Sequence, residues 1–233
     1  MQPIPIVYGM TIGEYALMLD GENWLSAEAN AINAYNVKTM PTADTPFHVL
    51  VIKCKNYDHL SKYILPVNPS PNLKEMQSVY LYPSTCFFEG TVLSEGRGTD
   101  KPFQYIGHPL LPHHLFSFLP MPNAGAKSSK CFYRKCYGWN LSGTVTEVLK
   151  RLNTRSQGYR IKLNYLMDAY RIFPGKDSFF LSNDFFNKLA GNDVLMQQIR
   201  KGLSEKEIRK SWDPALGEFK RIRKKYLLYK DFD

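Results

Sequence analysis

The stretch CFFEGTVLSEGRGTDKPF spans residues 86–103 and gathers carboxylates, a guanidinium, glycines and hydroxyls into one short segment. Glu89 follows an apolar run and precedes a glycine, so we expect it where an ordered element ends. Gly96 and Gly98 flank Arg97, and glycine takes positive φ and lets a ligand or another backbone approach closely. Loops held by a rigid scaffold often carry function. This segment is therefore the first candidate for a site.

A plainer interpretation of the same residues stays open. Arg97 could form a structural salt bridge with Glu95 or Asp100 inside a β-turn region. Composition alone does not separate the two alternatives, so the rest of the chain has to be considered.

The composition is that of a globular protein. Its 233 residues suffice for one large domain or two small ones. The net charge is +9, and residues 201–230 hold ten Lys and Arg against four Asp and Glu. A nucleic-acid patch would explain this charge, and so would contact with an anionic polymer such as a cell-wall glycan. The basic residues alternate with apolar ones at helical spacing, which favours a solvated helix face, and we predict no nucleic-acid partner.

The cysteines and histidines predict neither a metal nor a cofactor. Cys131 and Cys136 could pair, but no CxxC motif occurs among the four cysteines, Cys54, Cys86, Cys131 and Cys136. The pair His113-His114 lacks an acidic or cysteine partner at a useful spacing. No apolar run approaches the ~18 residues of a membrane span, and no signal peptide is recognisable.

Helix and strand signals alternate in the first 90 residues. Thr11 and Glu14 form a capping-box pattern that begins a helix over 11–19, so Glu14 is first of all a helix cap. Residues 47–53 form a continuous apolar run typical of a buried parallel strand. These signals favour part of an α/β layer.

Prolines punctuate the middle of the chain. Three of them make 66–72 a loop, and Asn72 at its end could present its amide to a ligand or cap the next helix. That helix takes its apolar face from Met76, Val79 and Tyr80. Pro83 is expected to start a new turn that runs to Glu89.

Helical patterns dominate the second half. A loop over 123–129 precedes a helix whose apolar face lies within 161–173, and two short helices follow with apolar residues between 185 and 199. Ser204 and Glu207 form a second capping box. An amphipathic helix is predicted over 212–228.

Five strings, taken together and in order, resemble the NamZ-type exo-β-N-acetylmuramidases, a bacterial family long catalogued as a domain of unknown function. They are YGMTIGEYA at 8–16, LPVNPSPNL at 65–73, YLYPSTCFFEGT at 80–91, EGRGTDKPF at 95–103, and the tail IRKSW at 208–212 with KYLLY at 225–229. No single string would suffice, but the set covers nearly the whole chain.

The resemblance implies an α/β fold in which a Rossmann-like domain precedes a smaller, helix-rich α+β domain, with the active site where they meet. We expect residues 1–92 to be the remainder of the first domain and 93–233 the second. Family members extend further at the N-terminus and carry a Gly-Pro-Glu-His-Gly-like segment that this chain lacks. The opening residues read like the inside of a domain, so we expect an N-terminally truncated chain that could be inactive by itself.

The activity implied by the resemblance is release of N-acetylmuramic acid from the non-reducing end of peptidoglycan fragments. Glycosidases of this kind use one carboxylic acid and a second carboxylate as base or nucleophile. The candidates on matching strings are Glu14, Glu89 and Glu95. Glu89 follows Phe87-Phe88, an apolar setting that would favour a protonated carboxyl.

The remaining candidates would hold the sugar. Arg97 could bind the lactyl carboxylate bidentately. Asn72, Thr99 and Asp100 could bind hydroxyls, and Phe103 could stack on the ring. The predicted partners are muramic acid glycosides derived from peptidoglycan, and such substrates suggest a periplasmic or exported protein. The alternative function is a non-catalytic module that binds peptidoglycan or sugar, and the sequence leaves the oligomeric state open.

Overall fold

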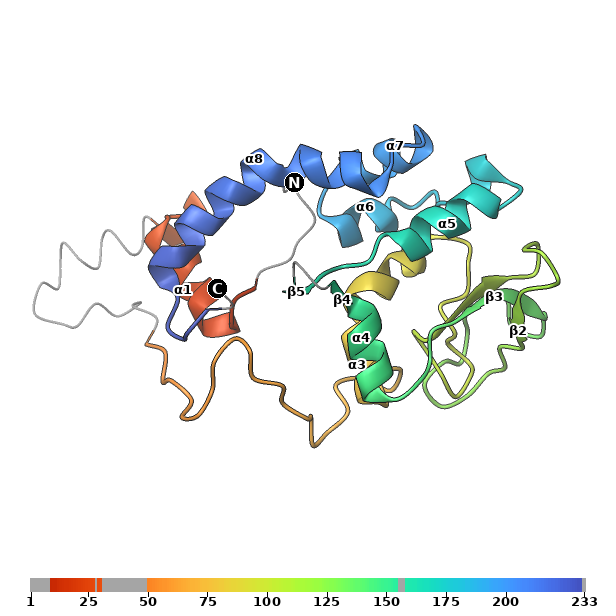
Figure 1. Ribbon diagram of the computed structural model, residues 1–233, viewed down its shortest axis with the longest axis horizontal. Coiled ribbons are helices and arrows are strands. Elements are labelled where there is room, and N and C mark those ends of the chain that lie inside the picture. Colours follow the sequence, from red (N-terminus) through yellow and green to blue (C-terminus); the bar gives the residue numbers. More distant parts are fainter. Residues whose placement is uncertain (1–8, 28, 31–49, 155–157, 232–233) are drawn as a thin grey trace, which may run out of the picture. The chain divides into compact units, whose positions relative to one another are not determined.

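The computed structural model describes residues 9–27, 29–30, 50–154 and 158–231 (Figure 1). These residues form two compact units. The larger unit comprises the described residues between 64 and 212, and the smaller unit comprises those between 9 and 63 together with 213–231. Helix and sheet are mixed, as the sequence predicts. The boundary expected between residues 92 and 93 remains a prediction.

Helix α1 (Ile12–Gly21) opens the smaller unit with the predicted capping box. Thr11 accepts a hydrogen bond from the backbone of Glu14, whose carboxylate accepts one from the backbone of Thr11. The short helix η3 (Lys224–Tyr226) packs against α1. Gly21 permits this approach, because a Cβ at that position would lie 2.5 Å from the Tyr226 hydroxyl oxygen. Within α1 the Ile12 side chain is exposed, whereas Glu14 and Met18 are buried.

The core of the larger unit lies among helices. They are α3 (Met76–Thr85), η1 (Cys86–Gly90), α4 (Val145–Leu152), α5 (Asn164–Ile172), η2 (Lys176–Ser178), α6 (Phe185–Ala190), α7 (Val194–Arg200) and the first part of α8 (Glu205–Arg223). Phe88, Phe179 and Phe186 fill the centre with no exposed surface. Gly90 lets η1 reach α6, because a Cβ there would lie 2.5 Å from the Phe186 Cα.

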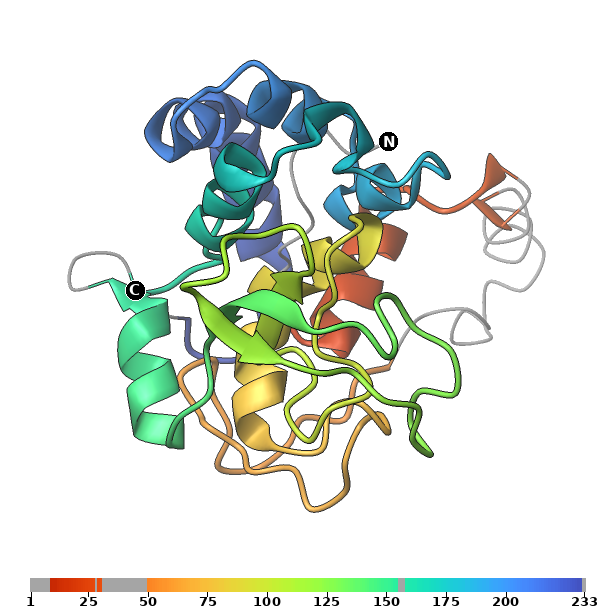
Figure 2. The same ribbon diagram turned by 90° about the vertical axis from the view of Figure 1, so that its right-hand side faces the viewer.

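A three-stranded antiparallel sheet completes this unit (Figure 2). The central strand β3 (Cys136–Asn140) pairs with β1 (Tyr105–His108) and with β2 (Phe116–Phe118). A two-stranded ribbon joins β4 (Asn153–Thr154) to β5 (Gly158–Tyr159). Gly138 of β3 lies directly opposite Gly107 of β1. A Cβ on Gly138 would stand 2.0 Å from the Ile106 carbonyl oxygen, so the sheet depends on a glycine there.

The prediction of a strand over 47–53 is wrong for the residues that the structure describes. Residues 47–49 lie outside the described residues, and Leu50, Val51, Ile52 and Lys53 form no strand. Leu50 and Ile52 are 86% and 87% exposed. A β-branched run becomes a strand only where a neighbouring strand satisfies its backbone, and no described strand pairs with it. The strands that are described all follow residue 90.

Two helix boundaries also differ from prediction, and both involve proline. Pro83 lies inside α3 instead of starting a turn, and η1 continues from it to Gly90. Helix α8 begins at Glu205, after the Ser204–Glu207 capping box, and continues through Pro214. The amphipathic pattern predicted a separate helix over 212–228, whereas α8 is continuous from Glu205 to Arg223.

The predicted helices over 161–173 and 185–199 are confirmed as α5, α6 and α7.

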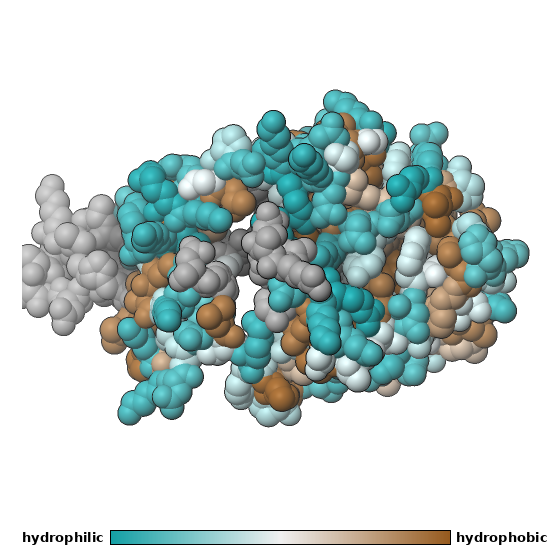
Figure 3. Space-filling model, viewed as in Figure 1, coloured by the Kyte–Doolittle hydropathy of each residue, from teal (hydrophilic) through white to brown (hydrophobic). Residues whose placement is uncertain are grey.

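Mainly hydrophilic residues lie over the stretch occupied by α8 (Figure 3), which fits the solvated basic face expected for it. Among the described residues, no helix has the length and apolarity that a bilayer crossing requires.

Candidate active site

Glu89 is positioned by the short helix η1. Its neighbours Phe87 and Phe88 are buried in the core and anchor the turn, while the Glu89 side chain remains 11% exposed. The Thr91 hydroxyl closes the turn by donating to the Phe88 carbonyl over 2.9 Å. Glu89 thus lies at the end of an ordered element, as predicted.

Glycines shape the segment that carries Arg97. Gly96 and Gly98 have φ values of +78° and +82°, a conformation that side chains disfavour. A Cβ on Gly96 would lie 2.8 Å from the Tyr105 carbonyl oxygen, and one on Gly98 would lie 2.6 Å from that of Met121. The two glycines therefore fold the loop tightly enough to present the Arg97 side chain beside η1.

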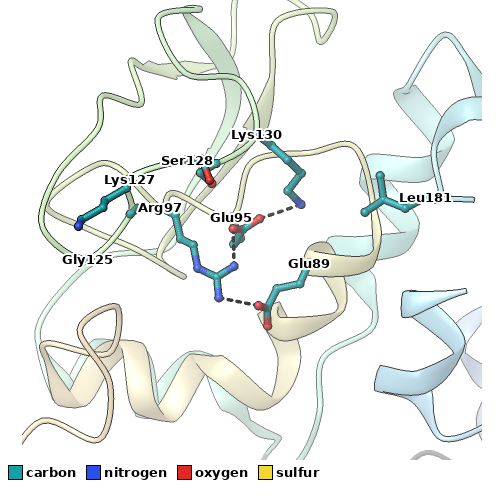
Figure 4. Close-up of a pocket in the computed structure, with 10 residues that line it drawn as sticks. Glu89, Glu95, Arg97, Gly125, Lys127, Ser128, Lys130 and Leu181 are labelled. Carbon is teal, nitrogen blue, oxygen red and sulfur yellow. Dashed lines mark hydrogen bonds and ion pairs between the residues drawn. The ribbon is translucent and has the colours of Figure 1, made fainter. Parts of the chain in front are cut away.

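Arg97 joins both carboxylates of this segment (Figure 4). Its Nη1 donates to Glu95 Oε1 over 2.8 Å, and its Nη2 donates to Glu89 Oε2 over 2.6 Å. The guanidinium also lies 5.0 Å from the centre of the Phe103 ring. The Tyr82 hydroxyl donates to the other oxygen of Glu89 over 3.3 Å. The Glu89 carboxylate is therefore in contact with a guanidinium and a hydroxyl, whereas the sequence suggested an apolar setting.

Lys130 approaches Glu95 from the opposite side. Its ammonium donates to the carbonyls of Phe88 and Thr91 over 2.7 and 2.9 Å. The same nitrogen lies 2.8 Å from Glu95 Oε2. That approach lacks hydrogen-bond geometry, so Oε2 accepts no aligned hydrogen bond even though the charges are close. We treat the contact as an ion pair, because two charges 2.8 Å apart attract strongly in a buried setting at any alignment.

The charges around Glu95 determine its protonation. The side chain is 1% exposed. Burial by itself raises the pKa of Glu95, but Lys130 and Arg97 outweigh it and hold the pKa below its usual value. Burial and the nearby Glu89 carboxylate raise the pKa of Tyr82 to about 12. At neutral pH the site therefore contains an ionised Glu95 and a Tyr82 hydroxyl that can donate.

The side chains of Glu89, Glu95, Arg97 and Lys130 line a cavity of about 420 Å³. Its remaining wall is Leu181 and the loop 125–129, from which Lys127 and Ser128 are drawn with the others in Figure 4. Cavities of a few hundred Å³ accommodate small organic ligands. This one combines acidic, basic and hydroxyl groups, which suits a polar ligand such as a sugar.

Asn72 contacts the loop that forms one wall of the cavity. Its side-chain amide donates to the Gly125 carbonyl over 2.8 Å, so it supports the loop that lines the cavity. It does not cap the next helix, whose first capping position is Glu75.

The other predicted sugar-binding residues have different settings. The Thr99 hydroxyl donates to the Gly96 carbonyl over 2.7 Å, and Asp100 is exposed. Phe103 is 1% exposed beneath Arg97, so stacking on a sugar would require its ring to leave the core. These three roles remain predictions.

Glu14 belongs to the smaller unit and is fully buried there. One carboxylate oxygen accepts from the backbone of Leu228 over 2.7 Å, and the other lies 2.9 Å from His59 Nε2. His59 in turn contacts Asp231, which Arg223 binds through both terminal nitrogens. This network connects α1 to the residues around Leu228 and Asp231, so Glu14 has a structural role in addition to capping α1.

Sequence reasoning missed Lys130 and the wall around it. The segment 123–129 suggested only a flexible loop, and Lys130 stands among residues with no pattern. Its partners Phe88, Thr91 and Glu95 lie far away along the chain, where a single sequence carries no signal of contact.

Comparison with known proteins now identifies the family. The profile described as exo-β-N-acetylmuramidase NamZ, C-terminal, matches residues 80–229, and the N-terminal profile of the same family matches residues 1–77. The chain belongs to the NamZ exo-β-N-acetylmuramidase family.

A curated relative supports the same family assignment. The peptidoglycan β-N-acetylmuramidase NamZ of Bacillus subtilis (strain 168) is 31% identical over 235 residues, which cover 98% of this chain and 52% of that protein. The chain therefore spans about half the length of this relative.

Two solved structures have a similar fold. A DUF1343 family protein from Bacteroides fragilis is 42% identical, with a TM-score of 0.80 over 99% of this chain and 58% of that one. A second DUF1343 family protein from the same organism is 19% identical, with a TM-score of 0.64 over 97% of this chain and 58% of that one. The second likeness concerns the fold alone.

Proposed function

We propose that the protein is a glycoside hydrolase that releases N-acetylmuramic acid from the non-reducing end of peptidoglycan fragments. Family membership supports this activity. The observation that carries the proposal is that Glu89 and Glu95 line one cavity and share Arg97. Most glycosidases use two carboxyl groups that face one space large enough for a sugar.

The two carboxyl groups have different environments, and we assign them different roles. Glu95 is enclosed by Lys130 and Arg97, which keep it ionised. An ionised carboxylate can stabilise the positive charge that develops at the anomeric carbon. It can then activate a water molecule as a base or attack that carbon as a nucleophile. Glu89 is the more exposed of the two, with 11% against 1% of its side chain accessible, and we assign it to protonation of the leaving oxygen.

Arg97 connects substrate binding to that protonation. Glu89 cannot act as an acid while its carboxylate is held by the guanidinium. The lactyl carboxylate of muramic acid is a chemically equivalent partner for Arg97. When it binds, it replaces Glu89 at Nη2, and Glu89 is released to take up the proton that it later donates. Sugars that lack the lactyl group would leave Glu89 paired and unreactive.

The direct test is release of N-acetylmuramic acid from a disaccharide with this sugar at its non-reducing end. We expect the 233-residue chain to release it, and Glu89→Gln and Glu95→Gln to lose at least 10²-fold in rate. Glu147→Gln is a matched control, because Glu147 caps α4 at the surface and glutamine serves equally well at that position. Full turnover by Glu89→Gln would contradict the assignment of Glu89.

Glu14→Gln tests the third candidate in the same assay. The amide oxygen retains part of the capping, while the charge is lost. We expect near-normal turnover at temperatures where the variant is folded, because the Glu14 carboxylate is saturated by its own unit. A rate loss as large as that of Glu89→Gln, with an unchanged thermal midpoint, would return Glu14 to the catalytic list.

A binding module without catalysis is the second candidate function. One observation favours it: Glu89, Glu95 and Arg97 already pair with one another, as in a purely structural ion-pair network. Retention of the disaccharide by the wild-type chain, with no sugar released, would establish this alternative. Titration calorimetry with the uncleaved disaccharide measures that binding directly.

Three further features are part of the proposal for the whole protein. We propose that its N-terminal part forms a Rossmann-like layer and that its partners are muramic acid glycosides from peptidoglycan. We also propose that it acts in the periplasm or after export, where such substrates arise. Detection of the protein in a periplasmic or medium fraction tests the last point.

A further inference from the structure

An exposed aromatic side chain stands at the end of the loop that forms the cavity wall. Tyr133 is 68% exposed, and it follows the cavity-lining residue Lys130 closely in the chain. None of the described residues that line the cavity is aromatic. Ligand sites are lined mainly by apolar and aromatic side chains, so Tyr133 offers a kind of surface that the charged cavity lacks.

Hydrogen bonds of the backbone connect Tyr133 to the glycine loop that presents Arg97. The Tyr133 amide donates to the Pro120 carbonyl over 3.0 Å. The next residue, Met121, donates through its amide to the Gly98 carbonyl over 2.8 Å. Gly98 follows Arg97 directly in the chain. Tyr133 therefore pairs with the same segment, 120–121, that packs on the loop of Arg97.

The Phe132 ring lies between that loop and Tyr133. A Cβ on Gly98 would lie 2.6 Å from the Phe132 ring, so the ring packs directly on the glycine. The rings of Phe132 and Tyr133 meet edge to face, with their centres 6.4 Å apart and 79° between their planes. Aromatic pairs favour this arrangement. The exposed ring thus has a half-buried aromatic support that contacts the site.

Tyr133 adopts an unfavourable backbone conformation. Its φ is +60°, a region that bulky side chains avoid and that asparagine and glycine tolerate. Backbone strain of this kind persists only where the surrounding structure imposes it, and it is concentrated at binding and catalytic sites. An asparagine at this position would relieve the strain. Stability of the fold therefore does not explain why a tyrosine is found here.

The size of the cavity leaves part of a longer ligand outside it. Its volume of about 420 Å³ is at the lower end of the range for ligand sites, which is roughly 300–1,000 Å³. If N-acetylmuramic acid occupies the cavity, the next ring of a peptidoglycan fragment lies beyond it. A pyranose ring has apolar C–H faces and polar edges. An exposed tyrosine can cover such a face while its hydroxyl remains in water.

We propose that Tyr133 is a specificity-determining residue that stacks on the sugar ring on the leaving-group side of the scissile bond. This inference rests on the proposed function, because that function places the muramic acid ring in the cavity. Tyr133 then contributes to the binding of fragments with two or more sugars. It takes no part in proton transfer, and a glycoside of muramic acid with a small leaving group does not contact it.

The test is titration calorimetry with the 233-residue chain that carries Glu89→Gln, which leaves the ligand uncleaved. The probes are a disaccharide with N-acetylmuramic acid at its non-reducing end and the methyl glycoside of N-acetylmuramic acid. Addition of Tyr133→Asn should weaken binding of the disaccharide about 10-fold and leave binding of the methyl glycoside unchanged. Tyr133→Phe keeps the ring and should bind both probes as the parent does.

Leu110→Asn is a matched control for the loss of an exposed apolar surface. Leu110 is 57% exposed and follows β1 at its His108 end. The Arg97 loop contacts the other end of this strand, where a Cβ on Gly96 would lie 3.2 Å from the Tyr105 Cβ. Leu110→Asn should therefore bind both probes with the affinity of the parent.

Thermal unfolding gives a second measurement on the same variants. Tyr133→Asn should have a midpoint equal to or higher than that of the parent, because asparagine tolerates the positive φ. Weaker disaccharide binding together with a lower midpoint would show damage to the turn and would contradict the stacking role.

The calorimetry separates failure of this inference from failure of the proposed function. If the methyl glycoside binds and Tyr133→Asn keeps its full affinity for the disaccharide, the stacking role is wrong and the proposed function stands. Equal weakening of both probes would also overturn the inference, since Tyr133 would then act through the cavity wall. If the parent binds neither probe, the proposed function fails and this inference fails with it.

Discussion

Lys130 lies 2.8 Å from Glu95 while its hydrogen bonds go to the carbonyls of Phe88 and Thr91. A single ammonium therefore holds a helical turn and neutralises a buried carboxylate at the same time. Removal of the ammonium would disturb both the position of Glu89 and the charge of Glu95. The predictions below begin with this relationship.

Lys130→Met should destabilise the chain by about 3 kcal/mol, because it leaves the buried Glu95 with one cation instead of two. Urea unfolding followed by tryptophan fluorescence measures the change. Lys127→Met is the matched control: Lys127 is exposed on the cavity wall, and its removal should change stability by less than about 0.5 kcal/mol. Equal stabilities for the two variants would show that the Lys130 contact contributes little.

Glu95 should make stability depend on pH in the acidic range. Its pKa in the folded chain is below the ordinary value of 4.5, so the unfolded state binds more protons there as the pH falls. The contribution of Glu95 is complete above that value and is lost as pH falls through the folded pKa. Glu95→Gln should therefore be less stable near neutral pH and show a shallower decline between about pH 5 and about pH 2. Parallel curves for both proteins would exclude this role.

Arg97→Lys should lower sugar release by about 10²-fold or more, although the charge is kept. A lysine ammonium cannot span Glu89 and Glu95 as the guanidinium does, and it offers no planar fork to a carboxylate. Comparison of N-acetylmuramic acid glycosides with their lactyl methyl esters provides the measurement. The wild-type chain should prefer the free acid strongly and the variant only weakly. An unchanged preference in the variant would mean that another group recognises the carboxylate.

Gly138→Ala should destabilise the sheet by about 2 kcal/mol or more, because the added methyl overlaps the Ile106 carbonyl opposite. Gly217→Ala is the control in α8, where an added Cβ meets no atom within 4 Å. It should raise stability by up to about 1 kcal/mol through helix propensity. Thermal unfolding of both variants shows whether space or conformational freedom determines the outcome at each glycine.

Local signals in the sequence were sufficient for the helix starts at Thr11 and Ser204, because a capping box involves residues only three positions apart. They also brought together Glu89, Glu95 and Arg97, which are neighbours along the chain. The sheet was missed because β1 and β2 are short and prolines surround them. Strand pairing is a long-range property, and the same reason explains why the apolar run at 47–53 was predicted as a strand, although its described residues 50–53 form none.

Contacts across the chain were beyond prediction from composition and spacing. Lys130 has no sequence feature that distinguishes it from Lys127, yet of these two lysines it is Lys130 that lies against Glu95. Phe103 was expected to stack on a sugar ring, but its side chain is 1% exposed and lies against the Arg97 guanidinium.

The contact between Asn72 and Gly125 has a consequence for how this family varies. Asn72 lies in the segment matched by the N-terminal family profile, and Gly125 lies in the segment matched by the C-terminal one. A Cβ on Gly125 would come within 3.0 Å of the Pro71 carbonyl oxygen, so the two segments fit closely. A chimaera of two relatives joined near residue 78 would mismatch this fit even if each half folded correctly. The shape of the cavity therefore depends jointly on both segments, and substitutions at the two positions should appear together.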